Sequence, residues 1–253
     1  MRPTRLAVAA VVMMVSARGA HAQTDSLPAQ AFVRRGGIQF QLGGARLGLS
    51  GLSRSLATNG LPAPAGSVFE TGTSGYLQFG RVVVAGSGFR SLTTTASNGV
   101  DQTSLRSTSG LIDIGFAIVD RPSTLLFPFL GGGRGGLVAR IRGASIGSVD
   151  DVLAAPHRGV ELSSRSWLVN AGVGLDQVVW SARSGRPITV GVRAGQLWRA
   201  GRVQFRADGD RIAGGPDASA AGPYLRLTLG LGLARRRDAL TSAVGSAVMG
   251  ILR

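Results

Sequence analysis

The chain has 253 residues, no Cys, 39 Gly and a formal net charge of +15. This length suits one all-β domain or two small ones, and the absence of Cys excludes disulfides and thiolate metal sites. Every basic residue is Arg, which indicates coding bias, and the arginines are scattered rather than clustered with aromatic residues. The charge therefore gives no support for nucleic-acid binding.

The N-terminus has the three parts of a secretory signal peptide. Arg2 and Arg5 precede an apolar run from Leu6 to Val15, and Ala20-His21-Ala22 is a small-residue cleavage motif. The apolar run is about half the ~20 residues that a membrane-spanning helix needs, so a cleaved signal is favoured over an anchor. We expect four segments: a signal peptide at 1–22, a leader at 23–33, a β-barrel at 34–234 and a tail at 235–253.

The rest of the chain alternates apolar with small or polar residues, which is the period of two expected of strands. Gly43-Gly44 shifts the phase of the first strand and predicts a β-bulge, after which Leu47 and Leu49 continue the same apolar face. The clearest hairpin has a tight turn at 120–123, where Pro122 fixes the backbone. Strands are predicted at 37–49, 68–78, 82–94, 110–119, 125–141, 167–179, 188–205 and 224–233.

The connections between these strands alternate in length. Tight turns are predicted at 79–81, 120–123 and 181–187, and long polar loops at 50–66, 96–107, 142–163 and 206–222. Eight strands joined in this order place every long loop at one end of an up-and-down sheet and both termini at the turn end. Transmembrane barrels have this asymmetry. The predicted fold is all-β, an eight-stranded antiparallel up-and-down transmembrane β-barrel.

The two faces of these strands differ in chemistry. One face is small or polar and carries four isolated charges, which are Asp113, Asp176, Arg193 and Arg226. Small residues suit the narrow interior of an eight-stranded barrel, where opposite charges can pair. We expect Asp113 to pair with Arg193 or Arg226. The apolar residues are then expected to face lipid: Ile112, Ile114, Phe116, Ile118, Val169, Val173, Leu175, Ile188, Val190, Val192, Leu225, Leu227, Leu229 and Leu231.

With its signal peptide, eight alternating strands and loop order, the chain resembles the small bacterial outer-membrane β-barrels, such as the OmpA transmembrane domain and OmpX. The resemblance covers nearly all of the mature chain and rests on pattern, without a diagnostic motif. It implies an outer-membrane location, a closed antiparallel barrel and a function carried mainly by surface loops. One departure is that such barrels usually end on a terminal aromatic, whereas here Arg235-Arg236-Arg237 and a tail follow the last strand.

The tail at 235–253 has a helical period, with Leu240, Val244, Val248 and Ile251 on one stripe. One interpretation is an interfacial helix held by the three arginines on anionic headgroups. The other is a weakly ordered extension, because its glycines lower helix propensity. Both interpretations stay open.

Two sequence motifs match those of enzymes. The run 131–136 matches G-x-G-x-x-G, but a dinucleotide site needs a helix after the glycines and none is predicted, so we interpret it as glycine packing in the barrel wall. The run 143–147 matches G-x-S-x-G, and Ser145, Asp151 and His157 can be drawn as a triad. Catalysis needs a base held by a rigid scaffold, which a long loop does not provide. No catalytic residue is predicted.

The sequence gives equally little support for a metal site. His157 is the one His of the mature chain, which excludes a site built from several His. Asp208, Asp210 and Asp217 have oxygen ligands for a hard cation, but turn chemistry explains them better. Arginines of the predicted surface are candidates for binding lipopolysaccharide phosphates, and they include Arg158, Arg165 and Arg211.

The sequence therefore predicts a non-enzymatic outer-membrane barrel of structural or surface-interaction type, with its extracellular loops as the interaction surface. Expected partners are outer-membrane lipid, lipopolysaccharide and the barrel-assembly machinery; no nucleic acid, metal or cofactor is expected. A lipid-modifying barrel enzyme, a narrow channel and a soluble periplasmic ligand-binding barrel, whose apolar face would point inward, are the alternatives.

Overall fold

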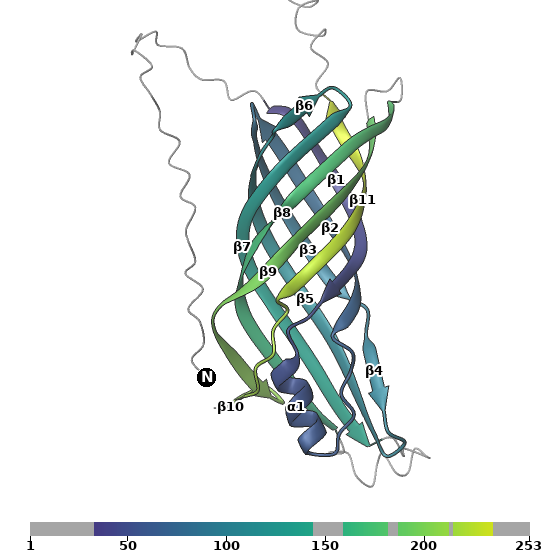
Figure 1. Ribbon diagram of the computed structural model, residues 1–253, viewed down its shortest axis with the longest axis vertical. Helices are drawn as coiled ribbons and strands as arrows, with labels where there is room; N and C mark the ends of the chain where they lie inside the picture. The colour runs from purple at the N-terminus through teal and green to yellow at the C-terminus, as the bar shows by residue number, and fades with distance from the viewer. Residues whose placement is uncertain (1–32, 144–158, 182–186, 213–214, 235–253) are drawn as a thin grey trace, which may run out of the picture. The chain divides into compact units, whose positions relative to one another are not determined.

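Long antiparallel strands make up most of the computed structural model, which describes residues 33–143, 159–181, 187–212 and 215–234 (Figure 1). The strands are β1 (Val33–Arg46), β2 (Ser67–Phe79), β3 (Val82–Ser91), β4 (Thr94–Ser97), β5 (Asp101–Phe116), β6 (Val119–Arg121), β7 (Thr124–Gly143), β8 (Gly159–Ser181), β9 (Pro187–Ala207), β10 (Asp210–Ile212) and β11 (Gly222–Ala234). The single helix among the described residues, α1 (Ser50–Thr58), follows β1. No helix in this part of the chain is long and apolar enough to cross a membrane.

Eight of the strands close into a ring in the order β1, β2, β3, β5, β7, β8, β9 and β11, with the last pairing back to the first. Every pairing is antiparallel, and Phe40 of β1 lies opposite Leu229 of β11 at the seam. The strands β4 and β10 extend the sheet as short hairpin arms on β5 and β9. The predicted all-β, eight-stranded antiparallel barrel is confirmed.

The two ends of the barrel differ as the alternating connections predict. Short turns at Gly80-Arg81 and Pro122-Ser123 lie at one end, where β1 also begins and β11 ends (Figure 1). The other end carries α1, β4 and β10. We call these the turn end and the loop end.

The predicted β-bulge at Gly43-Gly44 is wrong. The register of β1 runs without a shift through both residues, with Gly43 opposite Arg226 on one side and Glu70 on the other. A Cβ on Gly43 would lie 2.1 Å from the carbonyl oxygen of Leu225, so this glycine allows a close backbone approach instead. Because no residue is inserted, Leu47 and Leu49 fall on the inner face, where both are buried.

Several predicted loops contain regular structure. The segment predicted as a loop at 50–66 begins with α1, the one at 96–107 contains parts of β4 and β5, and the one at 206–222 contains β10. The strand β8 also begins at Gly159, well before the predicted start. Toward the loop end, the outward positions of the strands become polar. The alternation of apolar and polar residues that indicates a strand is therefore lost, although the backbone pairing continues.

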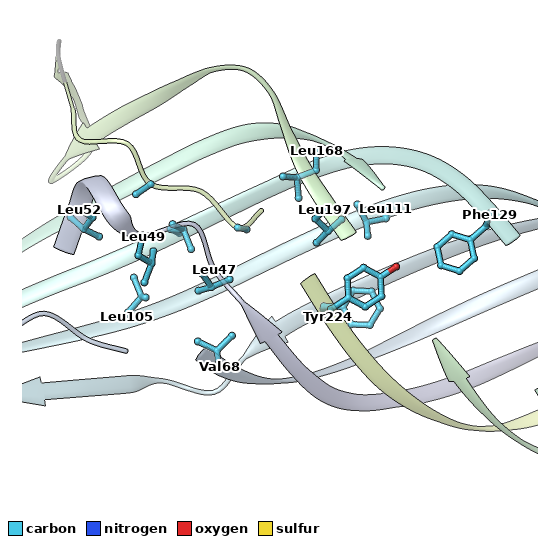
Figure 2. Packing of buried hydrophobic residues seen from close by; sticks show 14 of the residues in the cluster. Leu47, Leu49, Leu52, Val68, Leu105, Leu111, Phe129, Leu168, Leu197 and Tyr224 are labelled. Carbon is cyan, nitrogen blue, oxygen red and sulfur yellow. The ribbon is translucent and has the colours of Figure 1, made fainter. Parts of the chain in front are cut away.

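The loop end of the barrel is filled by an apolar core that the helix completes (Figure 2). Leu52 and Leu56, four residues apart on one face of α1, are buried together with Leu49. They belong to the same cluster as Leu105 and Leu168 of the barrel wall. The helix therefore packs its apolar face into the interior at the loop end.

Glycines on the inner face make room for large side chains from neighbouring strands. A Cβ on Gly172 would lie 2.7 Å from Cζ of Phe129, and one on Gly131 would lie 2.2 Å from Oδ1 of Asp113. The G-x-G-x-x-G run at 131–136 lies within β7, and the chain continues as the same strand to Gly143. Its role as glycine packing in the barrel wall agrees with the prediction, and this alternation of small and large interior residues is how a narrow barrel fills.

The close fit at these glycines yields a stability prediction. We expect Gly172→Ala to lower the free energy of unfolding by about 1–3 kcal/mol, because the methyl group overpacks the interior. Gly110→Ala is the matched control, since a Cβ there has no atom within 4 Å, and we expect it to be neutral or slightly stabilising. Urea unfolding in detergent micelles, followed by Trp fluorescence, measures both. Equal effects of the two substitutions would contradict the packing account.

Candidate functional site

Charged side chains gather inside the barrel as two ion pairs. Arg193 Nη2 of β9 lies 2.7 Å from Oδ2 of Asp176 on β8, and Arg226 Nη2 of β11 lies 2.8 Å from Oε2 of Glu70 on β2. All four side chains are at most 10% exposed. Buried pairs of this kind persist because removing one partner leaves the other charge uncompensated.

The two guanidinium groups also stack on aromatic rings. The guanidinium carbon of Arg226 lies 3.5 Å from the ring centre of Phe89 and 4.0 Å from that of Tyr224. That of Arg193 lies 4.8 Å from the ring centre of Phe127. Arginine suits such a site because its planar, weakly hydrated cation stacks on ring faces while its edge binds a carboxylate.

The register explains why each arginine needs its own carboxylate. Arg193 and Arg226 are directly opposite one another across β9 and β11, where like charges repel. Asp176 approaches Arg193 from the β8 side. Glu70 reaches Arg226 from two strands away because Gly43, which lies between them in the register, has no side chain.

Asp113 does not pair with either arginine, so the predicted Asp113–Arg193 or Asp113–Arg226 ion pair is wrong. Asn170 donates a hydrogen bond of 2.8 Å from Nδ2 to Oδ1 of Asp113, and Tyr224 donates one of 2.9 Å to Oδ1 of Asn170. The two hydrogen bonds thus connect Tyr224 through Asn170 to the carboxylate of Asp113. Sequence reasoning placed Asp113 on the interior face but missed Glu70 and Asn170 as members of the same cluster.

A cavity of about 30 Å³ lies within the cluster, and its lining includes Gln39, Asp113 and Arg193. This volume has room for about two water molecules. The described buried ionisable groups are three carboxyl and two guanidinium groups: Glu70, Asp113, Asp176, Arg193 and Arg226. We call these five residues the ionic core.

The outer wall carries the opposite chemistry. The predicted lipid-facing residues occupy outward positions, with Ile112 67% and Leu225 58% exposed, while Ile188 and Val192 are half-buried. Other exposed apolar side chains extend the same wall, including Ile38, Phe40, Leu77 and Leu130. We call this set of outward apolar residues the apolar belt. Trp167 and Trp198 lie on its loop-ward side, and sequence reasoning did not identify Trp198 as part of it.

The remaining predicted candidates give no assembled site. Ser145, Asp151, His157 and Arg158 lie outside the described residues. Within the described part of the chain no group of three His, Asp or Glu side chains is arranged to hold a metal ion. The carboxylate of Asp208 accepts the backbone N–H of Glu161, and Asp217 pairs with Arg199, as expected for structural loop charges.

No protein-family model and no curated protein matches the sequence. Among solved structures, the attachment invasion locus protein Ail of Yersinia pestis is similar with 13% identity and a TM-score of 0.39, over 79% of this chain and 98% of that chain. The outer-membrane protease OmpT of Escherichia coli has 10% identity and a TM-score of 0.39, over 83% and 99%. The outer-membrane protein OprG of Pseudomonas aeruginosa has 10% identity and a TM-score of 0.40, over 80% and 97%. Identities this low transfer no activity to this chain.

The Glu70–Arg226 pair can be tested with a double-mutant cycle. We expect Arg226→Met to cost about 3–5 kcal/mol of unfolding free energy, because Glu70 stays buried without its partner. Adding Glu70→Gln should recover part of that loss, with a coupling of about 0.5–3 kcal/mol. Arg140→Met, which breaks the exposed pair with Glu161, is the control and should cost at most about 1 kcal/mol. Strict additivity of the two interior substitutions would exclude the pair.

The two interior aspartates should differ in the same assay. Asp176→Asn removes the charge that faces Arg193 and should destabilise the barrel by about 3–5 kcal/mol. Asp113→Asn keeps an oxygen that accepts the hydrogen bond from Asn170, so we expect a change below about 1 kcal/mol. A larger loss for Asp113→Asn than for Asp176→Asn would mean that Asp113 is the essential partner of an arginine.

Proposed function

We propose that this chain is an outer-membrane β-barrel of structural or surface-interaction type, exported through its N-terminal signal peptide. The observation that carries the proposal is the apolar belt, which surrounds a closed barrel whose charges are inside. In water such a surface would be a large association site. In a bilayer it is the surface that lipid requires, because a closed barrel leaves no unpaired strand edge.

The height of the belt fits a membrane. On β8 the outward residues from Trp167 to Val179 are apolar except for Gln177. This stretch is about 40 Å long at ~3.3 Å per residue, and a strand tilt of about 40° reduces it to about 30 Å across the bilayer. The hydrocarbon core of a bilayer has about that thickness.

The packed interior argues against two of the alternatives. A soluble ligand-binding barrel needs an apolar interior and a polar outer wall, and this barrel has the reverse through its middle section. A channel needs a continuous water-filled path, whereas the ionic core lies across the described interior and leucines of α1 pack into the interior at the loop end. We therefore assign the binding of extracellular partners to the loop end. Lipopolysaccharide and the barrel-assembly machinery are the expected partners in the cell envelope.

Cell fractionation tests the proposal directly. We expect the full chain, expressed in a Gram-negative bacterium, to be recovered in outer membranes and to migrate faster on unheated than on heated gels, because a closed barrel resists the detergent. Recovery in the osmotic-shock fluid with no mobility change would overturn the membrane location. Activity on a phospholipid that is lost in Ser145→Ala and His157→Ala, in protein that still folds, would establish the enzyme alternative.

A charge placed in the belt gives a sharper prediction. Leu229→Arg puts a guanidinium at an exposed position between Phe40 and Val190. In lipid vesicles we expect a loss of about 2–4 kcal/mol of folding free energy, since charge on the lipid face is expensive near the midplane. Thr108→Arg, at an outward polar position, should cost less than about 1 kcal/mol. Equal tolerance of both substitutions would place the belt in water.

A further inference from the structure

A second group of arginines lies outside the barrel, beyond the loop-ward edge of the apolar belt. Four exposed arginines occupy outward positions on neighbouring strands: Arg106 on β5, Arg134 on β7, Arg165 on β8 and Arg206 on β9. We call these four the outer arginine patch. Their neighbours in sequence at the inward positions, such as Leu105 and Phe205, are buried, which fixes the outward direction of the arginines.

The strand register brings three of the four close together. Arg134 lies opposite Trp167 across β7 and β8, two residues from Arg165. Arg165 lies opposite Gln204 across β8 and β9, two residues from Arg206. Each arginine is thus the diagonal neighbour of the next on one face, a separation of about 7–8 Å. One headgroup with more than one charge can therefore contact several of them.

No ion pair joins the outer arginine patch to a carboxylate of the described part of the chain. Among the described residues, Arg106 bonds only the hydroxyl of Thr93, at 3.0 Å. Of the acidic groups on the same part of the sheet, Glu161 pairs with Arg140 at 2.6 Å, and Asp208 accepts the backbone N–H of Glu161. The patch presents four cations on an exposed wall.

The patch is continuous with the belt through Trp167. The guanidinium carbon of Arg134 lies 4.4 Å from the ring centre of Trp167, which is 56% exposed. Two residues further toward the turn end, Val169 begins the apolar positions of β8. Tryptophan is enriched where hydrocarbon meets headgroups, so this stacked pair marks that level of the barrel.

We propose that the outer arginine patch binds the phosphate groups of lipopolysaccharide's lipid anchor in the outer leaflet. The proposal rests on the proposed outer-membrane location. Guanidinium groups bind phosphate through paired N–H donors, while the acyl chains of the same molecule lie against the adjoining belt. The continuity of charge with apolar surface selects a lipid, because a soluble polyanion would use the arginines alone.

Lipid binding by the full-length protein, purified from outer membranes in detergent, tests the proposal. The probes are diphosphoryl lipid A and the same lipid after removal of its phosphates. We expect Arg165→Gln/Arg206→Gln to weaken binding of the diphosphoryl form about tenfold, as the loss of two exposed charge-assisted contacts implies. Arg81→Gln/Arg121→Gln removes the same charge from exposed sites at the turn end and should leave the affinity unchanged.

Three results would overturn the assignment. These are equal affinity for the dephosphorylated lipid, equal weakening by both double variants, and stronger binding of heparin than of lipid A at the patch, which would identify a soluble polyanion as its ligand. Two further measurements separate failure of the patch assignment from failure of the proposed outer-membrane location. If Arg165→Gln/Arg206→Gln is still recovered in outer membranes and still shows the heat-dependent gel shift, a negative result in lipid binding rejects the patch assignment alone. If the unsubstituted protein shows neither property, the membrane location itself is rejected.

Discussion

Closing eight strands into a ring leaves an interior only as wide as the side chains that fill it, so any charge inside must be compensated there. Arg193 and Arg226 face each other across β9 and β11 and repel, and each draws a carboxylate from the opposite direction. The Glu70–Arg226 pair connects β2 to β11 across β1, the strand that lies between them. It therefore spans the β1–β11 seam at which the ring closes. The ionic core therefore contributes to ring closure as well as to filling.

The glycines of the wall are the other half of this arrangement. A Cβ on Gly174 would lie 2.8 Å from Cζ of Phe127 and 3.0 Å from Cδ of Arg193, so the position accommodates both an aromatic ring and the cation stacked on it. Gly43 performs the same function between Glu70 and Arg226. Large and charged side chains can meet across the barrel only because the strands between them present no side chain. The glycines at these inward positions thus follow from the small radius of the barrel.

The period of two predicted the eight strands of the ring, and the alternating lengths of their connections predicted the order in which they pair, because both are local properties of the sequence. It did not predict Glu70 as the partner of Arg226, since the two residues lie two strands apart and their contact depends on a glycine of the strand between them. It also misassigned Gly43-Gly44, because a glycine pair has the same appearance in sequence whether it inserts a residue or permits a close approach. The strands beyond the belt were predicted as loops for a similar reason, since outward polar residues such as Arg165 remove the contrast between the two faces.

Arginine is used in opposite ways on the two sides of this wall. Inside, its cost of desolvation is offset by carboxylates and aromatic rings, and the described interior holds only two guanidinium groups beside three carboxyl groups. The positive excess of the sequence must then be carried outside the core. Coding bias accounts for the choice of Arg over Lys, but it does not account for Arg134, Arg165 and Arg206 lying as diagonal neighbours on adjacent strands beside an exposed tryptophan. Their repulsion is tolerable at an exposed surface where counterions or anionic headgroups are available, and that is the condition at the outer face of a membrane.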